Sequence, residues 1–171
     1  MKRILYSLSL LGLLLVLGCT KEGEVKPTNW NGNNNNNFTA TSVTIKRIIV
    51  TAFPQTNNGS AWDPTNLGSN RNPDPYPRIM MGGSEQYRGQ YWEDATQSDL
   101  PMRWTSDVRI SKVNFDTRVD LDLYDYEVTT SDTWMGGYYI SFSKWVGTYP
   151  KTVTISNSTS PYEFQLELEW N

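Results

Sequence analysis

The sequence predicts an all-β fold, an antiparallel sandwich of about eight strands, over residues 39–171. No stretch of this region shows a sustained helical period, and short runs rich in β-branched and aromatic residues alternate with turn residues. From 164 to 170, apolar residues alternate strictly with polar ones, as in a strand with one face in a core. A region of about 130 residues is the size of one domain.

The bounds of the predicted strands follow from where each apolar run stops. The strands are expected at 42–53, 76–81, 87–92, 108–113, 119–126, 138–142, 152–155 and 164–170. The alternation slips near Arg47, which predicts a β-bulge in the first strand. Pro77 marks the second as an edge strand or a strand start, and Gly136-Gly137 predicts a turn before the sixth. Eight short antiparallel strands favour two packed sheets.

Residues 1–18 have the properties of a signal peptide. Lys2 and Arg3 precede an apolar run, Ile4–Leu17, whose 14 residues are too few for a membrane-spanning helix. The run ends in Leu-Val-Leu-Gly-Cys, which resembles the lipobox of bacterial lipoproteins. The resemblance implies cleavage before Cys19 and lipidation of that cysteine with acyl chains such as palmitate. The alternative is an ordinary secretory signal with an incidental cysteine.

Residues 19–38 are expected to form a flexible, Asn-rich tether. They include Pro27, Gly32 and the run Asn33–Asn37, and they offer few apolar groups for burial. Lys21-Glu22-Gly23-Glu24 partly resembles signals that send lipoproteins to the cell surface. The predicted location is therefore the outer membrane or surface of a Gram-negative bacterium, with the membrane as partner through the Cys19 lipid.

Composition excludes several function classes. The chain has no histidine and one cysteine, which removes the usual general base, the thiol nucleophile and the commonest zinc ligand, so no enzyme activity is expected. With Lys2 and Arg3 removed, thirteen basic against 18 acidic side chains leave a net charge of −5. That charge argues against nucleic acid as a partner.

Carboxylates gather where the strand at 119–126 ends. Val119, Leu121 and Leu123 keep a period of two up to that point, and Asp125, Glu127 and Asp132 follow. A strand end that delivers several carboxylates to one loop suits a hard cation, which prefers many oxygen ligands.

Several landmarks, in the right order from about residue 42 to 170, resemble those of C2 domains. They are Pro73-Asp74-Pro75-Tyr76, Leu100-Pro101-Met102-Arg103-Trp104, Leu123-Tyr124-Asp125-Tyr126-Glu127, Asp132-Thr133-Trp134-Met135-Gly136 and the closing Leu-x-Leu-x-Trp. Trp62-Asp63 also looks like a C2-like subset found in bacterial lipoproteins. The resemblance implies an eight-stranded antiparallel sandwich whose loops gather carboxylates around calcium.

The candidate calcium ligands implied by this resemblance are Asp63 and Asp74 from the first loop, and Asp125, Glu127 and Asp132 from the third. The family usually has Asp where Glu127 stands, and Asp132 lies one place earlier than its last third-loop aspartate. The alternative is that these acids only shape turns, since Asp commonly hydrogen-bonds its own backbone there.

Three functions remain open at this stage. The first is a C2-like lipoprotein that binds calcium and docks on phospholipid or an envelope protein. The second is a carbohydrate-binding sandwich, because 7 Trp and 10 Tyr leave room for an aromatic surface on which a glycan stacks. The third is a structural subunit of an outer-membrane assembly.

Overall fold

The computed structural model describes residues 21–22, 24–28, 38–63, 72–128 and 130–171. The domain within them contains the eight strands that the sequence predicts. They are β3 (Ser42–Ala52), β4 (Pro75–Met81), β5 (Ser84–Arg88), β6 (Met102–Ser111), β7 (Val119–Asp125), β8 (Thr133–Ile140), β9 (Thr152–Ser156) and β10 (Glu163–Trp170).

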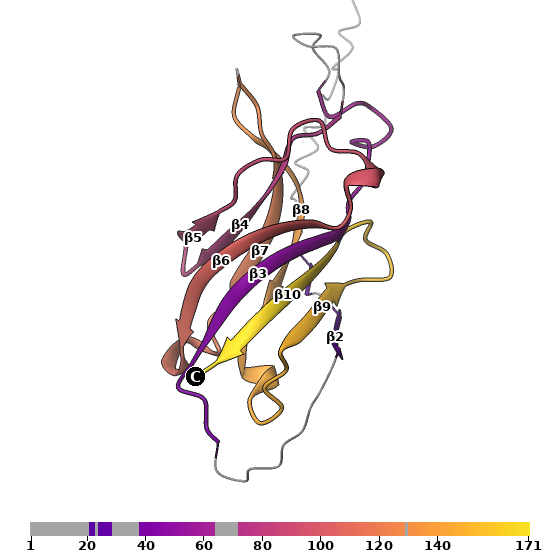
Figure 1. Ribbon diagram of the computed structural model, residues 1–171. Coiled ribbons are helices and arrows are strands. Elements are labelled where there is room, and N and C mark those ends of the chain that lie inside the picture. The colour runs from indigo at the N-terminus through magenta and orange to yellow at the C-terminus, as the bar shows by residue number, and fades with distance from the viewer. Residues whose placement is uncertain (1–20, 23, 29–37, 64–71, 129) are drawn as a thin grey trace, which may run out of the picture.

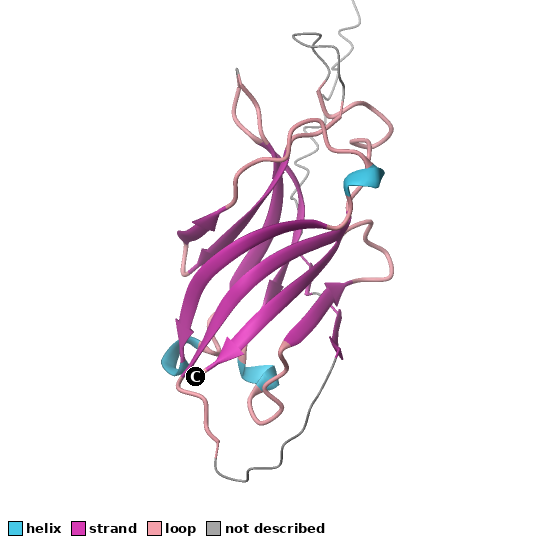
Figure 2. Ribbon diagram, in the orientation of Figure 1, coloured by secondary structure: helices cyan, strands magenta, loops and turns pink. Residues whose placement is uncertain are grey.

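Two twisted sheets face each other and form a sandwich (Figures 1 and 2). One sheet has the order β1-β8-β7-β4-β5 and the other the order β2-β9-β10-β3-β6. All pairings among β3–β10 are antiparallel. The prediction of an all-β antiparallel sandwich is confirmed.

The core lies between the sheets and is built by the alternation read from the sequence. In β10, Phe164 and Leu166 are fully buried, whereas the polar residues Gln165, Glu167 and Glu169 reach solvent. In β7, Leu121 and Leu123 point into the same core from the other sheet. Each such buried side chain removes enough apolar surface from water to stabilise the fold by about 1.5–3 kcal/mol.

The predicted bulge in the first strand is present. The register of β3 against β6 shifts between Ile45 and Arg47, and β10 shifts against β3 opposite the same place. The extra residue lets Ile45 and Ile48 both face the core although they are three positions apart.

Three strands begin at least three residues earlier than predicted. β5 starts at Ser84 instead of residue 87, β6 at Met102 instead of 108, and β8 at Thr133 instead of 138. In β8, Gly136 and Gly137 therefore lie inside the strand, opposite Leu123 and Asp122, and do not make the expected turn. Both serve close approach: a Cβ on Gly136 would overlap the Tyr162 ring, and one on Gly137 would overlap the Asp122 carboxylate.

Part of the segment expected as a tether is paired in the structure. β1 (Lys21–Glu22) runs parallel to β8, and β2 (Glu24–Thr28) runs antiparallel to β9. β1 lies at the edge of one sheet, beside β8, and β2 lies at the edge of the other sheet, beside β9. Both edges are on the same side of the sandwich (Figure 1). Edge strands carry unpaired N–H and C=O groups, so a short extended segment adds to them whatever its side chains are. The signal peptide, Cys19 and residues 29–37 lie outside the described residues.

The ends of the sandwich differ. Loops after β3, β5 and β7 meet at the upper end in Figure 2, with the turn η1 (Gln97–Asp99), and η2 (Lys112–Asn114) and η3 (Ser143–Trp145) lie at the lower end. None of the helical segments in the described part of the chain has the length and apolarity to cross a membrane.

Gly137→Ala tests the close approach inside β8. The new methyl group would meet the Asp122 carboxylate and lie 2.7 Å from the Leu121 carbonyl oxygen. We expect the free energy of unfolding to fall by about 1–3 kcal/mol, as for other overpacked sites. Urea denaturation measures it, with Thr105→Ala on the exposed face of β6 as a control that should change it by less than about 0.5 kcal/mol. A neutral Gly137→Ala would contradict the assigned packing.

Candidate metal centre

The central residue of the candidate site, Asp125, is buried because of its place in β7. The side chains of Val119, Leu121 and Leu123 enter the core, and Asp125 is the next residue in the same phase. Its relative exposure is 0%. It is also the last residue of β7, so the chain turns into the loop directly after it.

Two further carboxylates reach Asp125 from neighbouring loops. Asp63 comes from the loop after β3, and Glu127 stands two residues beyond Asp125. Each of the three offers one oxygen atom, and these atoms all lie within 4.8 Å of one another. The structure thus brings together three of the five predicted ligands.

The two oxygen atoms of Asp125 have different surroundings. Oδ1 accepts a hydrogen bond of 2.6 Å from the amide of Asp74. Oδ2 is buried and has no hydrogen-bond partner among the described residues. A buried acceptor without a partner costs about 1–3 kcal/mol, and more when it is charged. A cation bound at this oxygen would satisfy it.

The same surroundings make Asp125 hard to ionise. Burial raises its pKa to about 7; the Asp74 amide opposes the rise, and the carboxylates of Asp63, Glu127 and Asp74 add to it. Burial and neighbouring carboxylates also raise the pKa of Asp63 and of Glu127 above their ordinary values. The three carboxylates therefore repel one another when all are ionised, and a bound cation would offset this repulsion.

Asp74 lies beside the cluster but not among the three converging oxygens. Its amide holds Asp125, and its Oδ1 accepts a 2.7 Å hydrogen bond from the amide of Asp94. Burial is the main reason that the pKa of Asp74 lies above its ordinary value. In this structure Asp74 joins the loop after β5 to the end of β7.

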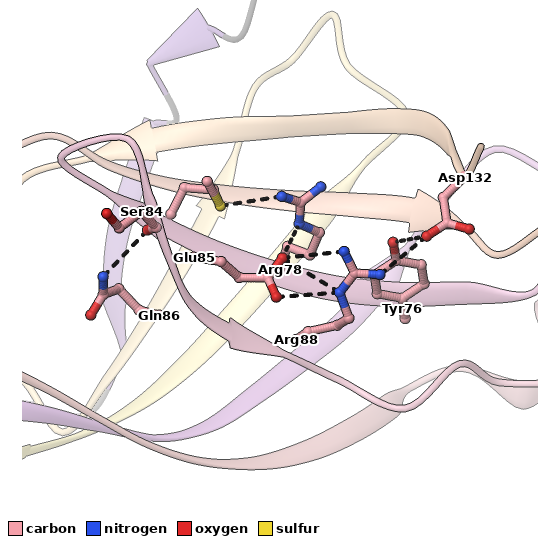
Figure 3. Close-up of polar contacts among 8 residues, drawn as sticks. Tyr76, Arg78, Ser84, Glu85, Gln86, Arg88 and Asp132 are labelled. Carbon is pink, nitrogen blue, oxygen red and sulfur yellow. Dashed lines mark hydrogen bonds and ion pairs between the residues drawn. The ribbon is translucent and has the colours of Figure 1, made fainter.

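Asp132 is held away from the cluster by other partners. Its Oδ2 accepts from the Tyr76 hydroxyl at 2.5 Å and from Arg88 Nη1 at 3.2 Å (Figure 3). Its Oδ1 accepts from the Glu127 amide at 3.2 Å. Burial opposes ionisation of Asp132, but these donors outweigh it, and its pKa lies below the ordinary value. The predicted ligand Asp132 thus positions the backbone of Glu127 in this structure.

A polar network on the outer face of β4 and β5 fixes these partners. Arg78 and Arg88 are directly opposite each other, and Glu85 lies between them, with its Oε2 2.8 Å from Arg78 Nε and 3.3 Å from Arg88 Nη2 (Figure 3). The Arg88 guanidinium lies 5.2 Å from the centre of the Tyr76 ring. The network orients the two side chains, Tyr76 and Arg88, that donate hydrogen bonds to Asp132.

Sequence reasoning missed Tyr76 and Arg88 as parts of the site. Their shared acceptor, Asp132, is 56 and 44 residues away in the chain, so no local pattern connects them. The available signal was the pairing of β4 with β5, which sets two arginines opposite each other and requires an acid nearby.

The loops around the cluster expose aromatic and apolar side chains. Tyr91 stacks on Tyr126 with ring centres 4.4 Å apart and nearly parallel planes. Tyr91 is 41% exposed, Trp92 38% and Val128 82%. The sequence predicted a strand through Trp92, but β5 ends at Arg88, so Trp92 lies in the loop that follows.

The fold of this domain matches that of C2 domains among solved structures. The chain is similar to a C2 domain of plant extended synaptotagmin 1, its domain A, with a TM-score of 0.55 and 13% identity over 78% of this chain and 96% of that one. The domain has a C2-like fold. It is also similar to human GIVD cytosolic phospholipase A2, solved with an inhibitor and terbium chloride, with a TM-score of 0.50 and 13% identity over 86% of this chain and 18% of that one. No protein-family model and no curated protein matches the chain.

Without calcium, the free energy of unfolding should rise as the pH is lowered from 8 to 5. The pKa of Asp125 is about 7 in the folded protein and about 3.9 in an unfolded chain, so the folded state binds more protons across this range. Asp125→Asn should reduce the rise by about 2–3 kcal/mol. The lowered pKa of Asp132 acts in the opposite direction, but only below about pH 4.

Urea denaturation at pH 5 to 8 in EDTA measures this dependence for both proteins. The other carboxylates with raised pKa values act in the same direction, so the variant keeps a residual slope. Equal slopes for the two proteins would contradict the assignment of a raised pKa to Asp125.

Proposed function

We propose that the protein is a non-enzymatic, lipid-anchored bacterial lipoprotein whose C2-like domain binds calcium and docks on phospholipid. The observation that carries the proposal is Asp125 itself: its Oδ2 is buried and has no hydrogen-bond partner among the described residues, and its carboxylate has an oxygen within 4.8 Å of oxygens of Asp63 and Glu127. A group that supplies positive charge at that point relieves both the missing hydrogen bond and the repulsion among the carboxylates.

The chemistry of the donors favours calcium. All three are carboxylates, and Ca²⁺ takes six to eight oxygen ligands at about 2.3–2.6 Å. Two oxygens on opposite sides of such an ion are about 5 Å apart, which matches three oxygens within 4.8 Å. Asp63, Asp125 and Glu127 would hold the ion, and lipid phosphate or water would supply further oxygens. Bound calcium supplies the positive charge that lets this end approach an anionic surface.

The exposed side chains around the cluster suit a membrane surface. Tyr91 and Trp92 combine an apolar ring with a polar group, the kind of residue enriched at the interface between lipid and water. Val128 projects from the loop between β7 and β8, where a membrane could bury it. We therefore favour phospholipid over an envelope protein as the partner at this end.

The lipid on Cys19 would keep the protein at a membrane whether or not calcium is bound. One acyl chain gives only marginal membrane binding, and stable anchoring takes two signals. Several chains on Cys19, or one chain together with calcium-dependent docking, would meet this need. The outer membrane of a Gram-negative bacterium is the location that this proposal implies.

Calcium should stabilise the full-length protein in a saturable way that magnesium does not reproduce. An extracellular module of this kind has a dissociation constant of about 10⁻⁴–10⁻³ M. A ligand at 100 times its dissociation constant adds about 2.7 kcal/mol, and each kcal/mol shifts the melting temperature by roughly 2–8 °C. Thermal melts in EDTA and across a calcium series measure the shift.

Two variants assign the shift to the cluster. Asp125→Asn should abolish it, and Asp116→Asn, which changes an exposed acid near η2, should leave it unchanged.

A third variant tests the place given to Asp132. Asp132→Asn should weaken calcium binding less than tenfold, since Asp132 positions Glu127 and does not converge with the cluster. Loss of the calcium shift in Asp132→Asn, with Asp125→Asn still responsive, would contradict the arrangement described here.

Flotation with vesicles tests the docking step. The full-length protein with Cys19→Ser should bind phosphatidylserine-containing vesicles in calcium but not in EDTA. Val128→Glu should reduce binding by about tenfold or more, because it places a charge at the lipid surface. Val113→Glu is the matched control, since Val113 is 88% exposed but lies in η2 at the other end of the sandwich. Equal losses in both variants would contradict docking by the loop end.

A further inference from the structure

A groove lies at the loop end, between the loop after β3, the start of β8 and the turn between β9 and β10. It consists of three hollows of about 340, 150 and 330 Å³. Pro161 and Tyr162 line all three, so the hollows adjoin one another. Trp134 lines the first two, and Trp62 lines the first. The largest hollow is within the range of about 300–1,000 Å³ that is typical of small-molecule sites.

The lining combines aromatic rings with polar groups that carry no charge. Besides the aromatic and proline rings, the first two hollows are bordered by hydroxyl and amide side chains. These are Thr56, Asn57, Asn58, Thr159 and Ser160. Among the described residues, no acidic or basic side chain lines these two hollows, and Glu163 lines only the third. A charged ligand would therefore find no counter-ion in most of the groove.

The polar atoms of the aromatic side chains are already used by the protein. Trp62 Nε1 donates to the Pro54 carbonyl at 2.9 Å, and Trp134 Nε1 donates to Asp122 Oδ1 at 3.1 Å. The Tyr162 hydroxyl donates to the Met135 carbonyl. These bonds fix the ring orientations, so a ligand would meet carbon surfaces that lose little freedom on binding.

A tight hairpin holds the polar rim in place. The amide of Asn57 donates to the Ser60 carbonyl at 2.8 Å, and the amide of Ser60 donates back at 3.0 Å. Asn58 and Gly59 between them have φ values of +52° and +87°, the geometry for which Asn-Gly is favoured. Side-chain amides both donate and accept hydrogen bonds, and those of Asn57 and Asn58 are exposed on this tip.

We infer that the groove binds a neutral oligosaccharide. A sugar ring has an apolar face of C–H groups that packs on an aromatic ring, and a rim of hydroxyls that donate and accept hydrogen bonds. Trp134 and Tyr162 supply the rings, while Asn57, Asn58 and Thr159 supply the rim. A purely apolar ligand would bury the amides without partners, which is costly. Three adjoining hollows accommodate more than one sugar ring.

Calorimetric titration of the full-length protein with neutral hexasaccharides of glucose, mannose, xylose and galactose tests this inference. We expect at least one of them to bind in EDTA, because no lining feature of the first two hollows requires a metal. Thr159→Arg fills the groove from an exposed position and should weaken binding at least tenfold. Thr105→Arg, exposed on the outer face of β6, is the matched control and should bind as the unchanged protein does. Asn57→Ala should weaken binding severalfold.

Three results would overturn the inference. They are no binding of any of these hexasaccharides at millimolar concentration, equal binding by Thr159→Arg and Thr105→Arg, and a preference for a galacturonate hexasaccharide. The inference is independent of the proposed calcium site: Asp125→Asn should lose the calcium shift and still bind the sugar.

Discussion

The phase of β7 places a carboxylate inside the protein, and the loop end is organised around that constraint. Three apolar residues enter the core in alternation, and Asp125 occupies the next inward position. Such a group requires donors or a cation. The loop before β4 supplies one donor, the Asp74 amide, and two more carboxylates each bring an oxygen within 4.8 Å of the Asp125 carboxylate. The polar network around Arg88 does not contact Asp125 directly. Arg88 binds Asp132, and Asp132 accepts from the Glu127 amide, so the network holds the backbone of the loop after β7.

Local pattern predicted the existence of each strand from β3 to β10, mostly because one face of the strand is buried with a period of two; β5, whose residues are exposed or half-buried, is the exception. The same pattern misplaced the starts of β6 and β8. Residues that normally interrupt strands lie there: Pro101 directly before β6, and Gly136 and Gly137 inside β8. Gly136 and Gly137 looked like a turn, but they lie inside β8 because the Tyr162 ring and the Asp122 carboxylate occupy the space above them. Only the three-dimensional neighbours distinguish these two uses of glycine.

The candidate site was predictable to the extent that its ligands follow from strand ends. Asp125 and Glu127 come from one strand end, and Asp63 follows a tryptophan that anchors its loop through a hydrogen bond to Pro54. The separation of Asp132 from the others was not predictable, because its donors are Tyr76 and Arg88, far away in the sequence. Long-range hydrogen bonds thus decide which acids converge in the cluster and which, like Asp132, bind neighbouring side chains and backbone.

The pairing of β1 with β8 would limit how far the domain extends from a lipid on Cys19. An extended chain spans at most about 3.3–3.6 Å per residue, so a leash of the twenty residues 19–38 would reach roughly 70 Å. β1 begins at Lys21, and a lipid on Cys19 would then be separated from the sheet by only about 7 Å of chain. A domain held this closely would sample its own membrane at high effective concentration and would scarcely reach a neighbouring surface.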